Sequence, residues 1–376
     1  MRKRGWFCLL LVLALGAGLM PAQAAELIVG EQVRLQLEDA HADYVDGLYR
    51  TPSGGYYIAW CDVWGQADEY THYWEALVNA DGSLLWQEEY ATPEGDNDDV
   101  MFASYRDASG WVMQHIEGLS GGMLRLVARD WTGRKRWATG WQSVDEDDEY
   151  SVSSVSGWLL TQWVDRGEHG QIAVRPLTGG EEHVYPLNAW TPGSICTFGD
   201  QLAILSEEEG KTICRFFDSA GVLQGSVEAP FAMAEDDKTL WLTAKIWRNA
   251  DGGLFLVLYR QGKGRYRDQG TCTCWTLKPG EEAFTPRWEV TIPDHSFYAS
   301  GGHAAVIGSE TLLMYDNEGV LYLLTSEGAE EVPLVGAKAM RLLTPERDEE
   351  LPVLILQDSE GTLWAQEVLG AEQDEW

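Results

Sequence analysis

The residues best suited to bind a small charged ligand lie in a short basic segment of an acidic chain. Arg265 and Arg267 flank Tyr266 inside the run 260–271, whose other basic residues are Arg260 and Lys263. Two guanidinium groups can hold a carboxylate or a phosphate through paired, charge-assisted hydrogen bonds. The segment therefore predicts a site for a carboxylate, a phosphate or an acidic sugar, with a solvated loop as the alternative.

Four further ligand-binding candidates occupy other predicted loops. These residues are Trp64, Tyr70, Arg166 and His169. Most of the 18 tryptophans fall in predicted strands, where packing explains them, so only a loop tryptophan such as Trp64 is a candidate for stacking on a sugar ring. Converging loops on a rigid scaffold are a usual place for binding.

An acidic run offers a metal-binding pattern. Asp96, Asp98 and Asp99 lie close together in a predicted loop, and alternating carboxylates begin a Ca²⁺-binding loop. The glycine and the distal glutamate of the EF-hand pattern are missing. The run therefore predicts a Ca²⁺ site or, as the default, a solvated loop.

No catalytic residue can be assigned from the sequence. Gly118 to Gly122 fits the nucleophile-elbow pattern around Ser120, but a predicted strand follows where the elbow requires a helix. The seven histidines show no zinc-binding spacing. Cys272 and Cys274 share one face of a predicted strand and could bind a metal or form a strained disulfide, although buried structural thiols are the commoner case.

These candidates depend on a repeat of about four strands that recurs along the chain. The first copy reads as strands at 44–49, 56–61, 72–78 and 84–90, joined by Gly- and Asp-containing turns. A turn glycine then recurs at intervals of 42 to 59 residues, at Gly82, Gly133, Gly179, Gly221, Gly280, Gly328 and Gly370. A period in the forties with four strands per copy is typical of β-propeller blades.

The two ends of the chain complement each other. The seventh copy contains only three strands, whereas 27–37 reads as an extra strand before the first copy. The sequence therefore predicts an all-β, seven-bladed β-propeller of four-stranded antiparallel blades over residues 25–376, in which the N-terminal strand completes the last blade.

Two of the copies resemble a known family. Residues 128–137 read Ala-Arg-Asp-Trp-Thr-Gly-Arg-Lys-Arg-Trp, and residues 79–86 form a shorter relative. Both are similar to the repeat of the quinoprotein-type (PQQ-like repeat) propellers. The resemblance implies that Asp130 with Gly133, and Asp81 with Gly82, shape turns, while Trp137 and Trp86 pack between blades. The dehydrogenases of that family hold pyrroloquinoline quinone with adjacent cysteines, and this chain has no Cys-Cys pair, so PQQ is not expected.

The N-terminus and the charge indicate where the protein acts. Residues 1–24 combine three basic residues, a short apolar run and an Ala-Gln-Ala cleavage site, which predicts a signal peptide and a secreted or extracytoplasmic protein without membrane insertion after cleavage. The mature chain would have 24 basic and 60 acidic residues, a formal charge of −36. Such a charge argues against nucleic acid as a partner.

The sequence favours a non-catalytic binding or scaffold propeller that uses loops at one end of the ring to bind a protein or a glycan. One alternative is an extracellular polysaccharide hydrolase or lyase, whose mark would be two inward carboxylates at glycosidase separation. Another is a Ca²⁺-stabilised structural repeat protein. No other cofactor is expected.

Overall fold

The structure of the chain is a computed structural model. It describes residues 26–38, 42–61, 72–91, 105–107, 110–117, 123–138, 142–143, 148–155, 158–165, 169–176, 183–188, 194–208, 210–218, 220–231, 239–262, 269–293, 303–316, 318–345 and 350–372. This part of the chain consists of strands and turns and contains no helix. The predicted signal peptide, residues 1–24, lies outside it.

The described strands pair into seven antiparallel sheets, which we number along the chain. The first sheet consists of β2 (Tyr44–Arg50), β3 (Tyr56–Cys61), β4 (His72–Val78) and β5 (Leu84–Ala91). The second consists of β6 (Tyr105–Asp107), β7 (Gly110–Glu117), β8 (Met123–Asp130), β9 (Lys135–Ala138) and β10 (Gln142–Ser143). The third consists of β11 (Asp148–Val155), β12 (Trp158–Asp165), β13 (His169–Pro176) and β14 (His183–Asn188).

The remaining sheets follow the same plan. The fourth consists of β15 (Ile195–Phe198), β16 (Gln201–Glu208), β17 (Lys211–Phe217) and β18 (Leu223–Glu228). The fifth consists of β19 (Thr239–Arg248), β20 (Leu254–Gly262), β21 (Gln269–Leu277) and β22 (Thr285–Pro293). The sixth consists of β23 (Ala304–Ile307), β24 (Thr311–Tyr315), β25 (Leu321–Thr325) and β26 (Gly328–Val332). The seventh consists of β27 (Ala337–Leu343), β28 (Val353–Asp358), β29 (Leu363–Glu372) and β1 (Glu26–Arg34).

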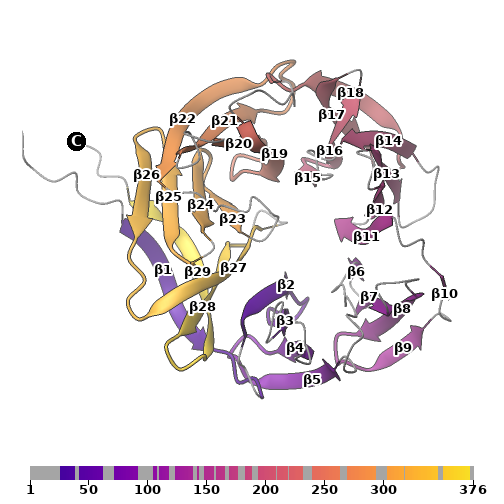
Figure 1. Ribbon diagram of the computed structural model, residues 1–376, viewed down its shortest axis with the longest axis vertical. Coiled ribbons are helices and arrows are strands. Elements are labelled where there is room, and N and C mark those ends of the chain that lie inside the picture. Colours follow the sequence, from indigo (N-terminus) through magenta and orange to yellow (C-terminus); the bar gives the residue numbers. More distant parts are fainter. Residues whose placement is uncertain are drawn as a thin grey trace, which may run out of the picture.

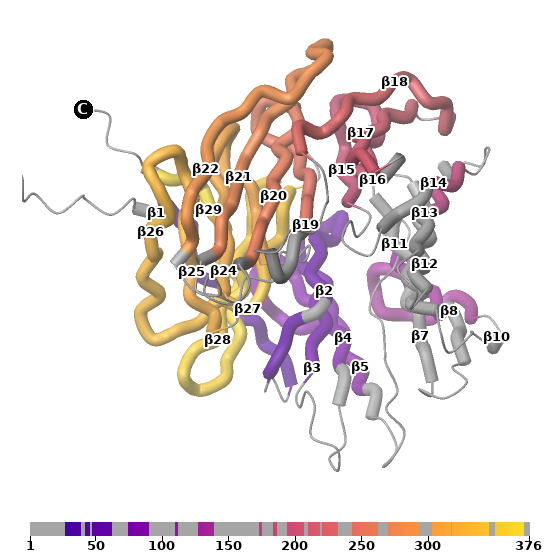
Figure 2. The backbone as a smooth tube through the Cα atoms, turned by 45° about the horizontal axis from the view of Figure 1, so that its top comes forward, coloured from indigo at the N-terminus to yellow at the C-terminus, as the bar shows by residue number. Residues whose placement is uncertain are grey.

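The sheets are arranged around a common centre, with the first strand of each sheet innermost (Figure 1). These inner strands contact one another in the order β6, β11, β15, β19, β23, β27 and β2. Figure 2 shows the same succession of sheets from a second direction. The fold is therefore a β-propeller, as the repeat predicted.

The N-terminal strand completes the last sheet. β1 pairs antiparallel with β29, from Leu27 opposite Ala371 to Arg34 opposite Trp364, so the seventh sheet has the order β1-β29-β28-β27. The predicted pairing of the two ends of the chain is thus confirmed. Because β1 precedes the first sheet in the sequence, this pairing joins the seventh sheet to the first without a covalent link between the termini.

One five-residue turn recurs through the described chain. Its first residue donates its N–H to the carbonyl of the fifth, and the glycine in fourth place donates back to the first. These glycines have φ between 73° and 84°, a region that side chains disfavour. The turns begin at Thr51, Asn79, Asp130, Asp218, Asn249, Asp316 and Asp358.

The turns correct two details of the sequence analysis. In the first sheet, the residue that begins the turn, as Asp130 does in the second, is Asn79. Asp81 lies in third place of that turn and accepts hydrogen bonds from the backbone N–H and the hydroxyl of Ser83. Gly370 is not a turn glycine, because it pairs with Ile28 inside β29. Gly280 lies in the connection between β21 and β22, Gly328 begins β26, and Gly179 lies outside the described residues. Of the predicted glycines, only Gly82, Gly133 and Gly221 belong to the recurring turn.

A tryptophan of the first sheet packs against a turn of the second. A Cβ placed on Gly133 would lie 2.2 Å from Cγ of Trp86, so only glycine fits beneath the indole ring. The guanidinium of Arg129 lies 4.8 Å from the centre of the same ring and pairs with Glu88 at 2.5 Å. The expected inter-blade role of Trp86 is confirmed, whereas Trp137 is 46% exposed.

Candidate functional site

Nearly all residues that the sequence analysis proposed for binding lie outside the described residues. Trp64, Tyr70, Arg166, Arg265, Tyr266 and Arg267 lie there, as do Asp96, Asp98 and Asp99. His169 begins β13, but its side chain is not among those described. Their roles therefore stay predictions.

The cysteines of the described residues are buried free thiols. They are Cys61, Cys196, Cys214, Cys272 and Cys274. Burial raises the pKa of Cys272 and of Cys274 far above the usual range, so both remain protonated and unreactive at neutral pH. This environment fits the structural reading of the two thiols.

The described residues contain no group of three or more His, Cys, Asp or Glu side chains that could hold a metal ion. No helix in the same part of the chain is long and apolar enough to cross a membrane.

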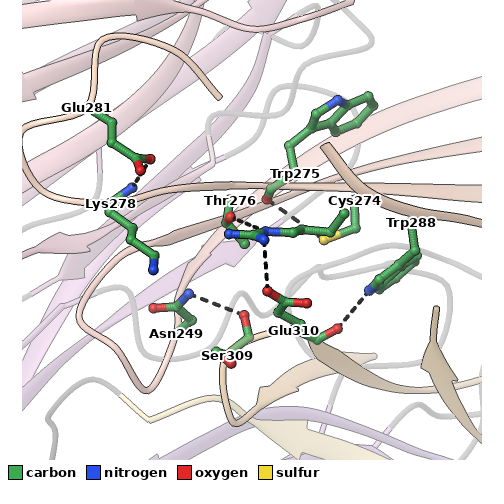
Figure 3. A network of polar contacts seen from close by, with 10 residues as sticks. Asn249, Cys274, Trp275, Thr276, Lys278, Glu281, Trp288, Ser309 and Glu310 are labelled. Atoms are coloured by element: carbon green, nitrogen blue, oxygen red, sulfur yellow. Dashed lines mark hydrogen bonds and ion pairs between the residues drawn. The ribbon is translucent and has the colours of Figure 1, made fainter. Parts of the chain in front are cut away.

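A polar network joins the fifth and sixth sheets and serves packing. The turn at 308–310 accepts from both sides: Trp288 donates its indole N–H to the carbonyl of Glu310 at 2.7 Å, and Asn249 donates to the carbonyl of Ser309 at 3.2 Å (Figure 3). The Glu310 carboxylate pairs with Arg287 at 3.2 Å. Because these groups satisfy one another, the network links two sheets and offers no open site.

The same junction contains a half-buried lysine. Lys245 lies opposite Val257 and shares a face of β19 with Thr243 and Trp247, so it faces the sixth sheet. Burial lowers its pKa from 10.5 to about 8, and no carboxylate contributes to the shift. The hydroxyl of Thr243, 2% exposed, has no hydrogen-bond partner.

The described residues do contain a cleft, and it lies between the sixth and seventh sheets. Its volume is about 500 Å³, within the range of ligand-binding pockets. One wall is the end of β26 with the connection to β27, and the other is the face of β1, β29 and β28. The lining residues are Leu27, Val29, Gln32, Val332, Pro333, Leu334, Val335, Ala337, Leu354, Leu356 and Gln366.

The two polar side chains of the cleft are occupied with each other and with the backbone. Gln366 donates its amide N–H to the carbonyl of Gly30 at 3.0 Å, and Gln32 donates to the amide oxygen of Gln366 at 3.5 Å. A ligand that covers them need not replace these hydrogen bonds, so burying the cleft carries a small polar cost. The rest of the lining is apolar.

The connection between β26 and β27 is a turn that carries apolar side chains. Pro333 ends β26, because proline lacks the N–H that a strand donates, and Gly336 with φ of 69° completes the turn. Between them Leu334 packs against the core of the seventh sheet, whereas Val335 is 98% exposed. The turn therefore holds an apolar side chain in solvent at the rim of the cleft.

Two of the large exposed apolar side chains in the described part of the chain line the cleft. They are Val29, 38% exposed, and Val335, 98% exposed. Single exposed apolar residues are ordinary, but contiguous ones mark interaction surfaces. We define the cleft surface as the lining residues.

Sequence reasoning missed this surface. The signal was the run Val332-Pro333-Leu334-Val335 in a connection between two sheets, where polar residues are the rule. Only the pairing of β1 with β29 brings Leu27 and Val29, more than 300 positions away in the sequence, to the opposite wall.

Three solved structures are similar to this chain in overall arrangement. The crystal structure of BamB from Moraxella catarrhalis is 13% identical, covers 91% of this chain and 99% of its own, and has a TM-score of 0.43. The β-propeller domain of the Trilobed protease from Pyrococcus furiosus is 10% identical, with coverage of 88% and 96% and a TM-score of 0.46. The Cps50 (Swd1) β-propeller domain from Myceliophteria thermophila is 10% identical, with coverage of 90% and 99% and a TM-score of 0.45.

No family model and no curated protein sequence matches the chain. The chain's assignment to the β-propeller class rests on its own sheet order and on the contacts between its inner strands.

Proposed function

We propose that this chain is an exported, non-catalytic, seven-bladed β-propeller that binds another polypeptide through the cleft surface. The observation that carries the proposal is the apolar cleft of about 500 Å³ between the sixth and seventh sheets, with Val335 98% exposed at its rim. Apolar side chains in contact with water raise the free energy of the protein. Burying them against a partner removes this unfavourable contact.

Three features support the wider description. The predicted signal peptide supports export, and the formal charge of −33 keeps a chain with exposed apolar groups soluble. The seven sheets, each made of four or five strands, support a complete ring of seven blades. The loop residues proposed from the sequence, Arg265 among them, extend the candidate binding region.

Photocrosslinking in the organism that produces the protein tests the proposal. p-Benzoylphenylalanine replaces Val335 in one variant and Val222 in the control; Val222 is an exposed apolar residue, 54% exposed, at the fourth sheet. We expect a discrete protein adduct from position 335 and none from position 222. No adduct at 335, or the same adducts at both positions, would contradict the proposal.

A further inference from the structure

The charges around the cleft select among polypeptide partners. In the segments that form its two walls, residues 26–33 and 326–337, the charged residues are all glutamates: Glu26, Glu31, Glu327, Glu330 and Glu331. The nearest basic residues along the chain, Arg34 and Lys338, lie just beyond these segments. The lining of the cleft is therefore largely apolar, and the segments that form its walls carry a net negative charge.

The backbone around the cleft favours an extended partner. β26 is the outermost strand of the sixth sheet and β1 the outermost strand of the seventh, so neither has a further strand beyond it in the described sheets. Both views place these two strands side by side at the left of the molecule (Figures 1 and 2). Such edges can accept an added strand, in which alternate side chains point to opposite sides.

We propose that the cleft surface binds an extended, cationic segment of another protein, in which apolar residues alternate with lysine or arginine. The apolar side chains contact Val29, Val335 and the apolar residues beside them, while the basic side chains complement the net negative charge of the two wall segments. This inference rests on the proposed function and specifies the chemistry of the partner.

Both kinds of side chain in the segment follow from the cleft. Val29 and Val335, which line it, are 38% and 98% exposed, so apolar side chains of the partner remove their surface from water. Glu31 and Glu331 are exposed in the two wall segments. Basic side chains of the partner complement this negative charge, whereas an all-apolar segment would not.

Fluorescence anisotropy with three labelled nonapeptides tests the inference on the mature chain. The first alternates valine with lysine, the second valine with glutamate, and the third serine with lysine. We expect the first peptide to bind at least tenfold more tightly than either of the others. We also expect its affinity to fall several-fold between 0.1 M and 1 M salt, because the screening length falls from about 10 Å to about 3 Å.

Variants then place the peptide on the cleft surface. Val335→Ser should weaken the valine-lysine peptide several-fold, whereas Val222→Ser should leave its affinity unchanged. The double variant Glu31→Gln, Glu331→Gln should remove most of the salt dependence. Its control, Asp251→Asn with Glu282→Gln, removes two exposed carboxylates at turns of the fifth sheet and should not do so.

Each outcome separates the two proposals. Equal affinity for all three peptides, no binding of the valine-lysine peptide, or no effect of Val335→Ser would overturn this inference. A crosslinked protein at position 335 would still support the proposed function in those cases. If position 335 yields no adduct but the peptide binds as described, the chemistry of the cleft is correct and the cellular role is wrong.

Discussion

Gly133 shows how a single residue links two sheets. Its φ of 83° and its contact with the Trp86 ring both require the absence of a side chain. Gly280 has a φ of 86° but open space where a Cβ would lie, so it isolates the backbone effect.

Gly133→Ala should therefore lower the free energy of unfolding by about 3 kcal/mol, against about 1 kcal/mol for Gly280→Ala. Urea denaturation measures both values. Adding Trp86→Ala should recover part of the loss at Gly133, since the clash disappears. Equal losses for the two glycine variants would mean that Trp86 does not pack on this turn.

Lys245 makes a second residue-level prediction, which concerns pH. Its folded pKa of about 8 lies below the ordinary 10.5, so between these values the unfolded chain holds a proton that the folded chain has released. Stability then rises with pH across this window. Below pH 8 both states are protonated, and the half-buried charge destabilises the folded state.

Lys245→Met should accordingly be more stable than the natural protein by about 2 kcal/mol at pH 7, with the difference shrinking as the pH rises from 8 to 10.5. Cys272, Cys274 and Tyr322 face the same junction and also titrate at high pH, so the informative quantity is the difference between variant and natural protein. Lys278→Met, at an exposed lysine, is the control. If the difference in stability between the variant and the natural protein did not change with pH, the pKa of Lys245 would not be lowered by burial.

At the scale of elements, β1 decides whether the ring is joined at its ends. Its partner β29 lies at the opposite end of the sequence, and the side chain of Leu35, just after β1, is 2% exposed in the core shared by the first and seventh sheets. Deleting residues 25–39 exposes this core and the edge of β29 together.

We expect the deletion to lower the melting temperature of the whole molecule by 10 °C or more, an estimate of about 3–5 kcal/mol for a domain of this size. Adding a synthetic peptide of residues 25–39 should restore part of the loss. An unchanged melting temperature in the truncated protein would refute the closing role of β1.

The elements also show what the sequence could reveal. Strand alternation, turn glycines and the unmatched strands at the two ends predicted the class of fold and the pairing of β1 with β29, because these features are local or depend on counting. The prediction of a turn at Gly370 was wrong, because a glycine within a strand cannot be told from a turn glycine by sequence. The cleft was not predictable, since its walls meet only through pairing across the whole chain.

At the scale of the whole molecule, the two ends of the chain meet in the seventh described sheet, and an apolar cleft lies beside their pairing. The strand that completes the seventh sheet also forms one wall of the cleft. A partner that binds the cleft as proposed would contact β1 and so stabilise the pairing of β1 with β29.

Hydrogen–deuterium exchange of the mature protein with and without saturating valine-lysine peptide tests this most directly. We predict slower exchange in residues 26–34 and 328–337 when the peptide is bound, and no change in residues 218–228 of the fourth sheet. Protection confined to other segments, or none at all despite measured binding, would contradict the placement of the binding site at the closure of the ring.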